Sequence, residues 1–287
     1  MHLLTETLAK THSEMQSATA GCLIQIHPMS IDAGVIRIED DPVVIGREPS
    51  CKVQIENDSV SRQHALIEQR GRGYFITDLN STNGVYVNDE LVAEHELSAG
   101  DRLRCGNHIF RFLDQIEAQY HETVYAMMTR DGLTGALNKR YLTEILNRDI
   151  ERCRRRNRPM AMILLDIDHF KKVNDTYGHL VGDEVLQELS RRIQQVIRGD
   201  ELFARFGGEE FAVLVSDGDL AEARELAERC FATVGSQPFD TSTGRIVVTI
   251  SVGIAEFKGD GTANSLIERA DQKLYRAKQT GRNQICG

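Results

Sequence analysis

Two glycines followed by two glutamates, at 207–210, are the residues of this sequence best suited to chemistry. Apolar runs at 202–204 and 211–215 flank them, which predicts a β-hairpin with a tight turn. Glycines allow positive φ in the turn and a close approach of ligand to backbone. We expect Glu209 and Glu210 on the outgoing strand, where they point to opposite faces and have different roles. A phosphate at the turn beside a cation-holding carboxylate is one interpretation, but on the hairpin alone a solvated turn is favoured.

A second strand is expected to bring another carboxylate to this turn. The apolar run 161–165 ends in Asp166, Ile167 and Asp168, so acids stand at the carboxyl end of a predicted buried strand. Magnesium prefers oxygen ligands and commonly takes one or two carboxylates together with substrate phosphates. Asp166 and an acid of the hairpin would supply these carboxylates if their strands are neighbours.

Two cations near the end of the chain complete this set of candidates. Lys278 and Arg282 are four residues apart at the end of a predicted helix, so both could reach one phosphate. The alternative interpretation is that cations simply favour a helix C-terminus.

Alternating helices and strands must position these residues. The predicted elements after the strand at 161–165 are helices at 182–197 and 219–234, a long strand at 246–257 and a helix at 264–279 that Gly281 ends. This alternation predicts an α/β sheet covered by helices.

The first half of the chain has a different pattern. Short apolar or alternating runs, separated by turn residues, predict an antiparallel β-sandwich. The runs are 35–38, 43–45, 53–55, 65–67, 74–76, 85–87, 103–105 and 109–113. The loops between them contain Gly46 and Arg47, the segment 61–64 and the segment 78–84. An arginine, hydroxyls and an amide that converge at one end of a sandwich would suit a phosphate.

The segment between the halves, 115–128, lacks Gly and Pro and has apolar residues at helical spacing. A helix here could pack against its twin in a dimer or on its own domain, and the sequence leaves both open.

Composition excludes several classes of protein. Of the 287 residues, 41% are hydrophobic and 27% charged, which is typical of soluble globular proteins. No apolar run is long enough to span a bilayer, so no membrane contact is expected. The net charge of −9 argues against non-specific nucleic-acid binding, and the basic run 152–158 is interpreted as a solvated helix end. Six cysteines without paired spacing indicate the reducing cytoplasm rather than disulfides or zinc.

The first half resembles the forkhead-associated (FHA) domain, on the residues Gly-Arg at 46–47, Ser-x-x-His at 61–64 and Asn-Gly at 83–84. The resemblance implies binding of a phosphothreonine-containing peptide or protein. Arg47 and Ser61 would grip the phosphate, Arg62, Thr82 and Asn83 would contact the peptide or phosphate, and Gly46, His64 and Gly84 would support the loops.

The second half resembles the GGDEF family of diguanylate cyclases, in its GGEEF form. The matching motifs stand in order: Asp-Gly-Leu-Thr-Gly at 131–135, Asp-Ile-Asp-His-Phe-Lys at 166–171, Asn-Asp at 174–175, Gly-His at 178–179, Gly-Asp at 182–183, Arg-Phe-Gly-Gly-Glu-Glu-Phe at 205–211, Ser-Val-Gly-Ile at 251–254, Ala-Asp at 270–271, Ala-Lys at 277–278 and Gly-Arg-Asn at 281–283. The resemblance implies a palm-like α/β (α+β) nucleotidyl cyclase fold and condensation of two GTP to cyclic di-GMP and two pyrophosphates.

The resemblance also implies site residues. Magnesium, which manganese can replace, would be held by Asp166, the carbonyl of Ile167 and Glu209. Glu209, Glu210 and Lys171 would be catalytic. GTP would be bound by Phe170, Lys171, Asn174, His179, Asp183, Gly207, Gly208, Lys278 and Arg282, with Asn174 and Asp183 reading guanine and the last two cations binding the terminal phosphates.

One position departs from the family. The family's inhibitory product site has Arg-x-x-Asp, which here becomes Arg198 and Glu201. Glu201 keeps the carboxylate of the family's aspartate, but its side chain is one methylene longer. The alternative interpretation of Arg198 is a cation that favours the end of a helix.

The expected organisation is a flexible N-terminus (1–20), an FHA domain (21–113), a helical linker (114–130) and a GGDEF domain (131–287). One domain holds one GTP, so the active unit would be a homodimer whose assembly the phosphopeptide module controls. A catalytically silent nucleotide sensor and a phosphoprotein adaptor are the alternatives.

Overall fold

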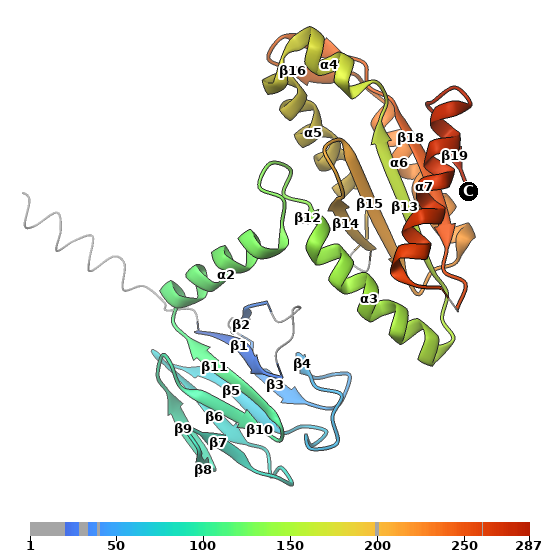
Figure 1. Cartoon of the computed structure of the whole chain (residues 1–287). Coiled ribbons are helices and arrows are strands. Elements are labelled where there is room, and N and C mark those ends of the chain that lie inside the picture. Colours follow the sequence, from blue (N-terminus) through green and yellow to red (C-terminus); the bar gives the residue numbers. More distant parts are fainter. Residues whose placement is uncertain (1–20, 29–33, 39–40, 199–200, 260) are drawn as a thin grey trace, which may run out of the picture. The chain divides into compact units, whose positions relative to one another are not determined.

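The computed structural model describes residues 21–28, 34–38, 41–198, 201–259 and 261–287, and the expected flexible segment 1–20 lies outside this part. The chain forms two compact units that divide between Tyr125 and Ala126 (Figure 1).

The first unit contains two sheets. In spatial order one sheet is β2 (Ile36–Ile38), β1 (Gly21–His27), β11 (His108–Leu113), β10 (Arg102–Cys105), β7 (Val85–Val87) and β8 (Glu90–Val92). The other is β4 (Val53–Gln54), β3 (Val43–Gly46), β5 (Ala65–Arg70), β6 (Gly73–Asp78) and β9 (Glu94–Leu97). Their inner faces share one core, in which Ile45, Ile76 and Phe110 are fully buried. The predicted β-rich module is confirmed, although β1, β8 and β9 lie outside the predicted runs. β8 and β9 are short and contain glutamates, so neither has a run of apolar residues long enough to predict a strand.

A six-stranded sheet forms the centre of the second unit. In spatial order it is β12 (Leu137–Asn138), β14 (Glu201–Arg205), β15 (Glu210–Ser216), β13 (Met160–Ile167), β18 (Ile250–Glu256) and β19 (Ile285–Cys286). β13 runs antiparallel to both neighbours, β15 and β18. All eight residues of β13 are buried, as the apolar run predicted.

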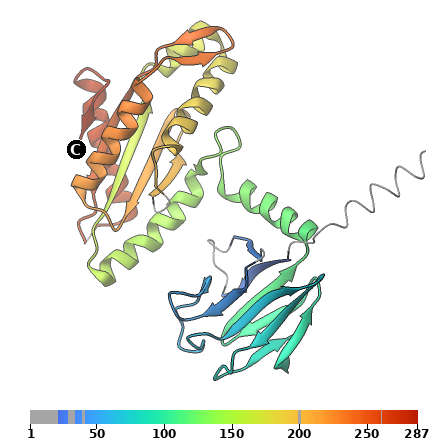
Figure 2. The same ribbon diagram turned by 180° about the vertical axis from the view of Figure 1, so that it is seen from behind.

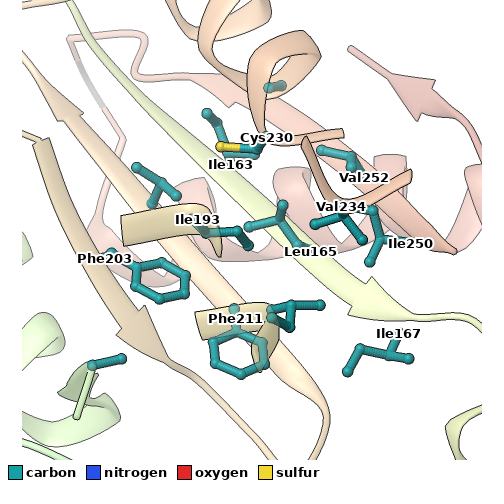
Figure 3. Close-up of a cluster of buried hydrophobic side chains, with 14 of the residues drawn as sticks. Ile163, Leu165, Ile167, Ile193, Phe203, Phe211, Cys230, Val234, Ile250 and Val252 are labelled. Carbon is teal, nitrogen blue, oxygen red and sulfur yellow. The ribbon is translucent and has the colours of Figure 1, made fainter. Parts of the chain in front are cut away.

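Helices cover both faces of this sheet (Figures 1 and 2). α5 (His179–Gln194) and α6 (Leu220–Gly235) pack on one face, where Figure 3 shows strand residues such as Leu165 and Phe211 against Ile193 and Cys230 of these helices. α3 (Lys139–Arg156) and α7 (Ala263–Gln279) cover the other. Gly253 permits the close packing of α7, because a Cβ there would overlap the backbone of Ala270. The predicted α/β fold is confirmed.

The long strand predicted at 246–257 is instead two strands. β17 (Gly244–Ile246) pairs with β16 (Phe239–Thr241) in a separate hairpin, and β18 begins only at Ile250, where pairing with β13 begins. Val247 between them is 79% exposed. The residues across this break are apolar or β-branched, so the sequence predicted one strand. The structure has two because β17 pairs with β16 whereas β18 pairs with β13.

The predicted linker helix is α2 (Gln115–Thr129). On one side Ala118 is buried against Cys22 and Leu113, and Glu122 forms an ion pair with Arg37 at 2.8 Å. This side packs on the first unit, which is one of the two arrangements that the sequence left open. No helix within the described residues is long and apolar enough to cross a membrane.

Candidate active site

The central strand and the predicted hairpin bring the candidate carboxylates together. β14 and β15 form the hairpin around Gly207 and Gly208, and β15 pairs with β13 so that Glu210 lies opposite Asp166. The backbone N–H of Ile167 points to the carbonyl of Glu209 at 3.4 Å. The condition that the two strands be neighbours is therefore met.

Two details of the turn differ from the sequence expectation. Glu209 lies in the turn and only Glu210 is on the strand. Neither Gly207 nor Gly208 is among the glycines with positive φ. Gly207 instead leaves room for a carboxylate, because a Cβ there would lie 2.5 Å from Glu210 Oε2, whereas Gly208 faces open space. The turn therefore needs a glycine at Gly207 because a side chain would overlap Glu210, and not because the backbone has positive φ there.

Asp166 is the buried acid of this cluster, with 5% of its surface exposed. Lys278 from α7 donates to Asp166 Oδ2 at 2.6 Å. Burial raises the pKa of Asp166 to about 6; Lys278 opposes this shift, while the charges of Glu209 and Glu210 add to it. The carboxylates are thus close enough to repel one another.

This donor set fits a magnesium ion. Within the described residues no three His, Cys, Asp or Glu side chains gather into a complete metal cage. Two carboxylates and a backbone carbonyl are nevertheless what Mg²⁺ commonly takes from a protein when substrate phosphates and water complete its shell.

The hairpin turn is held by a charged pair, Arg205 and Asp131, that was not predicted from the sequence. Arg205 donates to the carbonyl of Gly208 from Nη2 at 2.7 Å and pairs with Asp131 at 3.1 Å. Asp131 also accepts from the Thr134 N–H at 2.9 Å and its hydroxyl at 2.7 Å. Both residues stand in the motifs quoted above, but their contact joins positions far apart in the chain, which local patterns do not reveal.

The remaining nucleotide candidates lie on α4 (Phe170–Tyr177) and at the start of α5. The Phe170 side chain is buried in the core, so only its backbone is available to a ligand, whereas Lys171 and His179 are exposed. Asn174 Oδ1 is buried and has no hydrogen-bond partner within the described residues. A Cβ at Gly182 would overlap this oxygen, and Asp183 follows on the same helix.

Arg282 is not part of the last helix. α7 ends at Gln279, and Arg282 lies in the following turn with φ +62°, its N–H donating to the Ala277 carbonyl at 2.9 Å. The prediction that Lys278 and Arg282 lie one helical turn apart is therefore wrong, because the i, i+4 spacing holds only within a helix.

The two product-site candidates are linked. The N–H of Arg198 donates to Glu201 Oε2 at 2.7 Å, and Arg229 of α6 lies 3.7 Å from Glu201 Oε1. Arg229 was not predicted, because only the packing of α6 brings it to this strand.

In the first unit, three loops bring the phosphopeptide candidates together. Arg47 follows β3, Ser61 and Arg62 precede β5, and Thr82 and Asn83 precede β7. Ser61 Oγ accepts from the Thr82 N–H at 3.0 Å, and the Ser61 carbonyl accepts from the Arg47 N–H at 2.9 Å. The Asn83 amide donates to the Ser59 carbonyl at 2.8 Å.

A buried histidine links these loops. His64 is fully buried, and its Nδ1 accepts from the Ser61 N–H at 3.1 Å. The proton is therefore on Nε2, which donates to the Gly84 carbonyl at 3.2 Å. Burial lowers the pKa of His64, which keeps the ring neutral. The structure thus places His64 as a loop support.

Comparisons with known proteins agree with both halves. The family model for the diguanylate cyclase GGDEF domain matches residues 128–284, and that for the FHA domain matches 43–106. The response regulator PleD of Caulobacter vibrioides is 38% identical over 229 residues, 78% of this chain and 49% of PleD. The diguanylate cyclase DgcP of Pseudomonas aeruginosa is 36% identical over 196 residues, 67% of this chain and 29% of DgcP. The chain thus spans half or less of the length of these relatives.

Solved structures resemble the second unit. The GGDEF domain of DgcB from Caulobacter crescentus, in complex with c-di-GMP, gives a TM-score of 0.54 at 33% identity and covers 55% of this chain and 92% of that chain. The diguanylate cyclase SiaD from Pseudomonas aeruginosa, in complex with its activator SiaC, gives 0.55 at 36% identity and covers 60% of this chain and 66% of that chain.

Proposed function

Since this chain belongs to the GGDEF family of diguanylate cyclases, we propose that it condenses two molecules of GTP into cyclic di-GMP and two pyrophosphates. The observation that carries the proposal is the meeting of Asp166, the Glu209 turn and Lys278 at one end of the central strand. Negative ligands for a cation and a positive partner for phosphate stand there side by side, as phosphoryl transfer requires.

Asp166, the Ile167 carbonyl and Glu209 would hold Mg²⁺, or Mn²⁺ in its place. The chemistry that the ion supplies when bound is neutralisation of the phosphate charge. Glu209, partly exposed in the turn, would take the proton from the attacking 3′-hydroxyl. Glu210 keeps the second carboxylate beside Asp166, and the exposed Lys171 would counter the charge that develops on the transferred phosphate.

The α4–α5 pair would read the base. The orphaned oxygen of Asn174 and the carboxylate of Asp183 are hydrogen-bond acceptors, and guanine presents N–H donors on its Watson–Crick edge where adenine presents an acceptor. Burial of an unpaired Asn174 oxygen costs free energy that a guanine donor would recover. This arrangement favours GTP over ATP.

The phosphates would lie between the hairpin and the end of α7. The backbone of Phe170, the turn at Gly207 and Gly208, and the exposed His179 would line the nucleotide. Lys278 and Arg282 would bind the terminal phosphates that leave as pyrophosphate.

Two such domains must face each other, because each binds one GTP. The exposed side of α2 offers a contact: Ile116, Tyr120 and Met127 are 76%, 68% and 75% exposed. Their spacing of four and seven residues is that of a coiled-coil seam. We assign this face to a homodimer, while the opposite face packs on the first unit.

The loops of the first unit would bind phosphothreonine, with Arg47 and Ser61 on the phosphate and Arg62, Thr82 and Asn83 on the peptide. Such binding would regulate how the cyclase domains meet. Arg198 and Glu201, with Arg229, would form a product site for feedback inhibition. GTP as substrate and six free cysteines agree with a cytoplasmic location.

The test is incubation of the purified chain with GTP and Mg²⁺, alongside Glu209→Gln and the matched control Glu228→Gln on the exposed side of α6. We expect cyclic di-GMP from the wild type and the control and none from Glu209→Gln. No product from any of them, even at concentrations that force dimers, would favour the nucleotide sensor. A phosphothreonine peptide should change the rate of product formation by the wild type but not by Arg47→Ala. This difference would support regulation by the loops of the first unit.

A further inference from the structure

The buried carboxylate of Asp168 has no role in the function proposed above. Asp168 lies just beyond β13 and is 7% exposed. Ser251 donates to its Oδ1 at 2.6 Å, and Thr249 and the backbone N–H of Asn283 donate to its Oδ2 at 2.7 and 2.9 Å. One side chain thus joins the end of the central strand, the start of β18 and the turn after α7.

The turn that Asp168 holds has an unusual backbone. Gly281, Arg282 and Asn283 have φ of +123°, +62° and +45° in succession. Non-glycine residues rarely adopt positive φ, and two in a row persist only where the surroundings hold them. On one side the Arg282 N–H is bonded to the end of α7, and on the other the Asn283 N–H is bonded to Asp168.

We propose that Asp168 is a positioning residue for Arg282. By holding Asn283, the carboxylate keeps the strained turn against the strand that also carries Asp166. The guanidinium of Arg282 is then presented at a constant place beside the Asp166–Lys278 end of the site. This inference rests on the proposed function, in which Arg282 binds the terminal phosphates of GTP.

The alternative role for such an acid is that of a metal ligand. Three neutral donors already use both oxygens of Asp168, which leaves little capacity for a cation. A neutral acceptor of the same shape would serve the turn equally well. Asparagine can keep its oxygen toward Asn283 and turn its amide toward the Ser251 hydroxyl, which can also accept.

The experiment is calorimetric titration of the full chain, in saturating Mg²⁺, with 3′-deoxy-GTP, which binds but cannot react, and with GMP, which lacks the terminal phosphates. The variants are Asp168→Ala, Asp168→Asn, Arg282→Ala and the double alanine variant. Ser251→Ala is the matched control, because it removes a bond from the oxygen of Asp168 that does not face the turn.

We expect Asp168→Ala and Arg282→Ala each to weaken 3′-deoxy-GTP binding about tenfold and GMP binding little, the scale of one hydrogen bond to a charged group. The double variant should bind no worse than Arg282→Ala, and Asp168→Asn and Ser251→Ala should bind nearly as the wild type does. Effects that add in full, or an Asp168→Asn variant as weak as Asp168→Ala, would overturn the inference and leave the cyclase proposal intact. If Arg282→Ala binds 3′-deoxy-GTP as tightly as the wild type does, both the inference and the role proposed for Arg282 are overturned.

If Asp168→Ala does not fold, hydrogen exchange of the wild-type chain decides. The Asn283 amide should exchange far more slowly than the exposed amides around it, because its acceptor is buried. Exchange at the rate of a free loop would contradict the inference.

Discussion

Replacement of Lys278 by methionine should destabilise the metal-free second unit and strengthen its response to Mg²⁺. Lys278 lies 2.6 Å from Asp166, with side chains 31% and 7% exposed. Breaking a fully buried ion pair costs about 3–5 kcal/mol, and exposed pairs contribute less than about 1 kcal/mol. This half-buried pair should therefore cost about 2 kcal/mol, which corresponds to a fall in Tm of about 4–8 °C for a unit of this size.

The response to metal should change in the opposite direction. In the wild type, an ion bound at Asp166 must displace the ammonium of Lys278, whereas Lys278→Met leaves the carboxylates facing one another without a cation. Mg²⁺ should therefore raise the Tm of the variant more than that of the wild type. Differential scanning calorimetry without nucleotide, with and without Mg²⁺ and at a pH well above the pKa of Asp166, measures both effects. Lys273→Met on the same helix is the control. Equal Mg²⁺ responses in variant and wild type would refute the competition.

The pH dependence follows from the same carboxyl. Because burial raises the pKa of Asp166 to about 6, its protonated form favours folding, and this contribution to stability is lost as pH rises from about 4 through 6. Mg²⁺ needs the ionised form, so its stabilising effect on the wild type should fade below about pH 6. The charge of Lys278 lowers the pKa of Asp166, so Lys278→Met should raise this pKa. The pH below which Mg²⁺ no longer stabilises the unit should therefore be higher in the variant.

Three further predictions follow from other contacts. Asp131→Asn should lower the rate of cyclic di-GMP formation about tenfold with little change in GTP affinity, because Arg205 then holds the turn less firmly. Initial rates measure product formation and nucleotide titrations measure affinity. An unchanged rate would contradict this prediction. Gly207→Ala should lower turnover without loss of fold, because its Cβ would lie 2.5 Å from Glu210 Oε2 and this carboxylate would have to move. Product assays and circular dichroism check this, and a variant as active as the wild type would disprove it. The β-sandwich should lose stability as pH falls below 6.5, because burial lowers the pKa of His64 from that value and unfolding therefore takes up a proton. Hydrogen exchange of the β5 amides tests this prediction. Protection that stays constant as pH falls would count against it.

The local elements around the candidate site were readable from the sequence because each is encoded over a few neighbouring residues. A continuous apolar run ending in Asp166 predicts a buried strand, and all of β13 is buried. Asp219 and Glu222, three residues apart, form the capping box that begins α6. Gly281 follows the last turn of α7, where a left-handed backbone ends a helix.

Where a local pattern was ambiguous, the sequence prediction failed. Residues 246–257 are almost continuously apolar or β-branched, so they predicted one strand. The break at 247–249 depends on a change of partner, from β16 to β13, that no local pattern reports. The turn glycines were likewise expected to supply positive φ, whereas the position of the Glu210 side chain is the constraint at Gly207.

The sequence by itself determined which residue types could do this chemistry and, for Asp166, Glu210 and Lys278, on which kind of element each would lie. Only the tertiary structure decided which of them meet: Arg205 with Asp131, Lys278 with Asp166, and Asp168 with the turn at Asn283. Periodicity and capping act over a few residues, whereas these contacts join positions separated by tens of residues or more. Such contacts form only when the packing of helices on the sheet places both partners within hydrogen-bond distance.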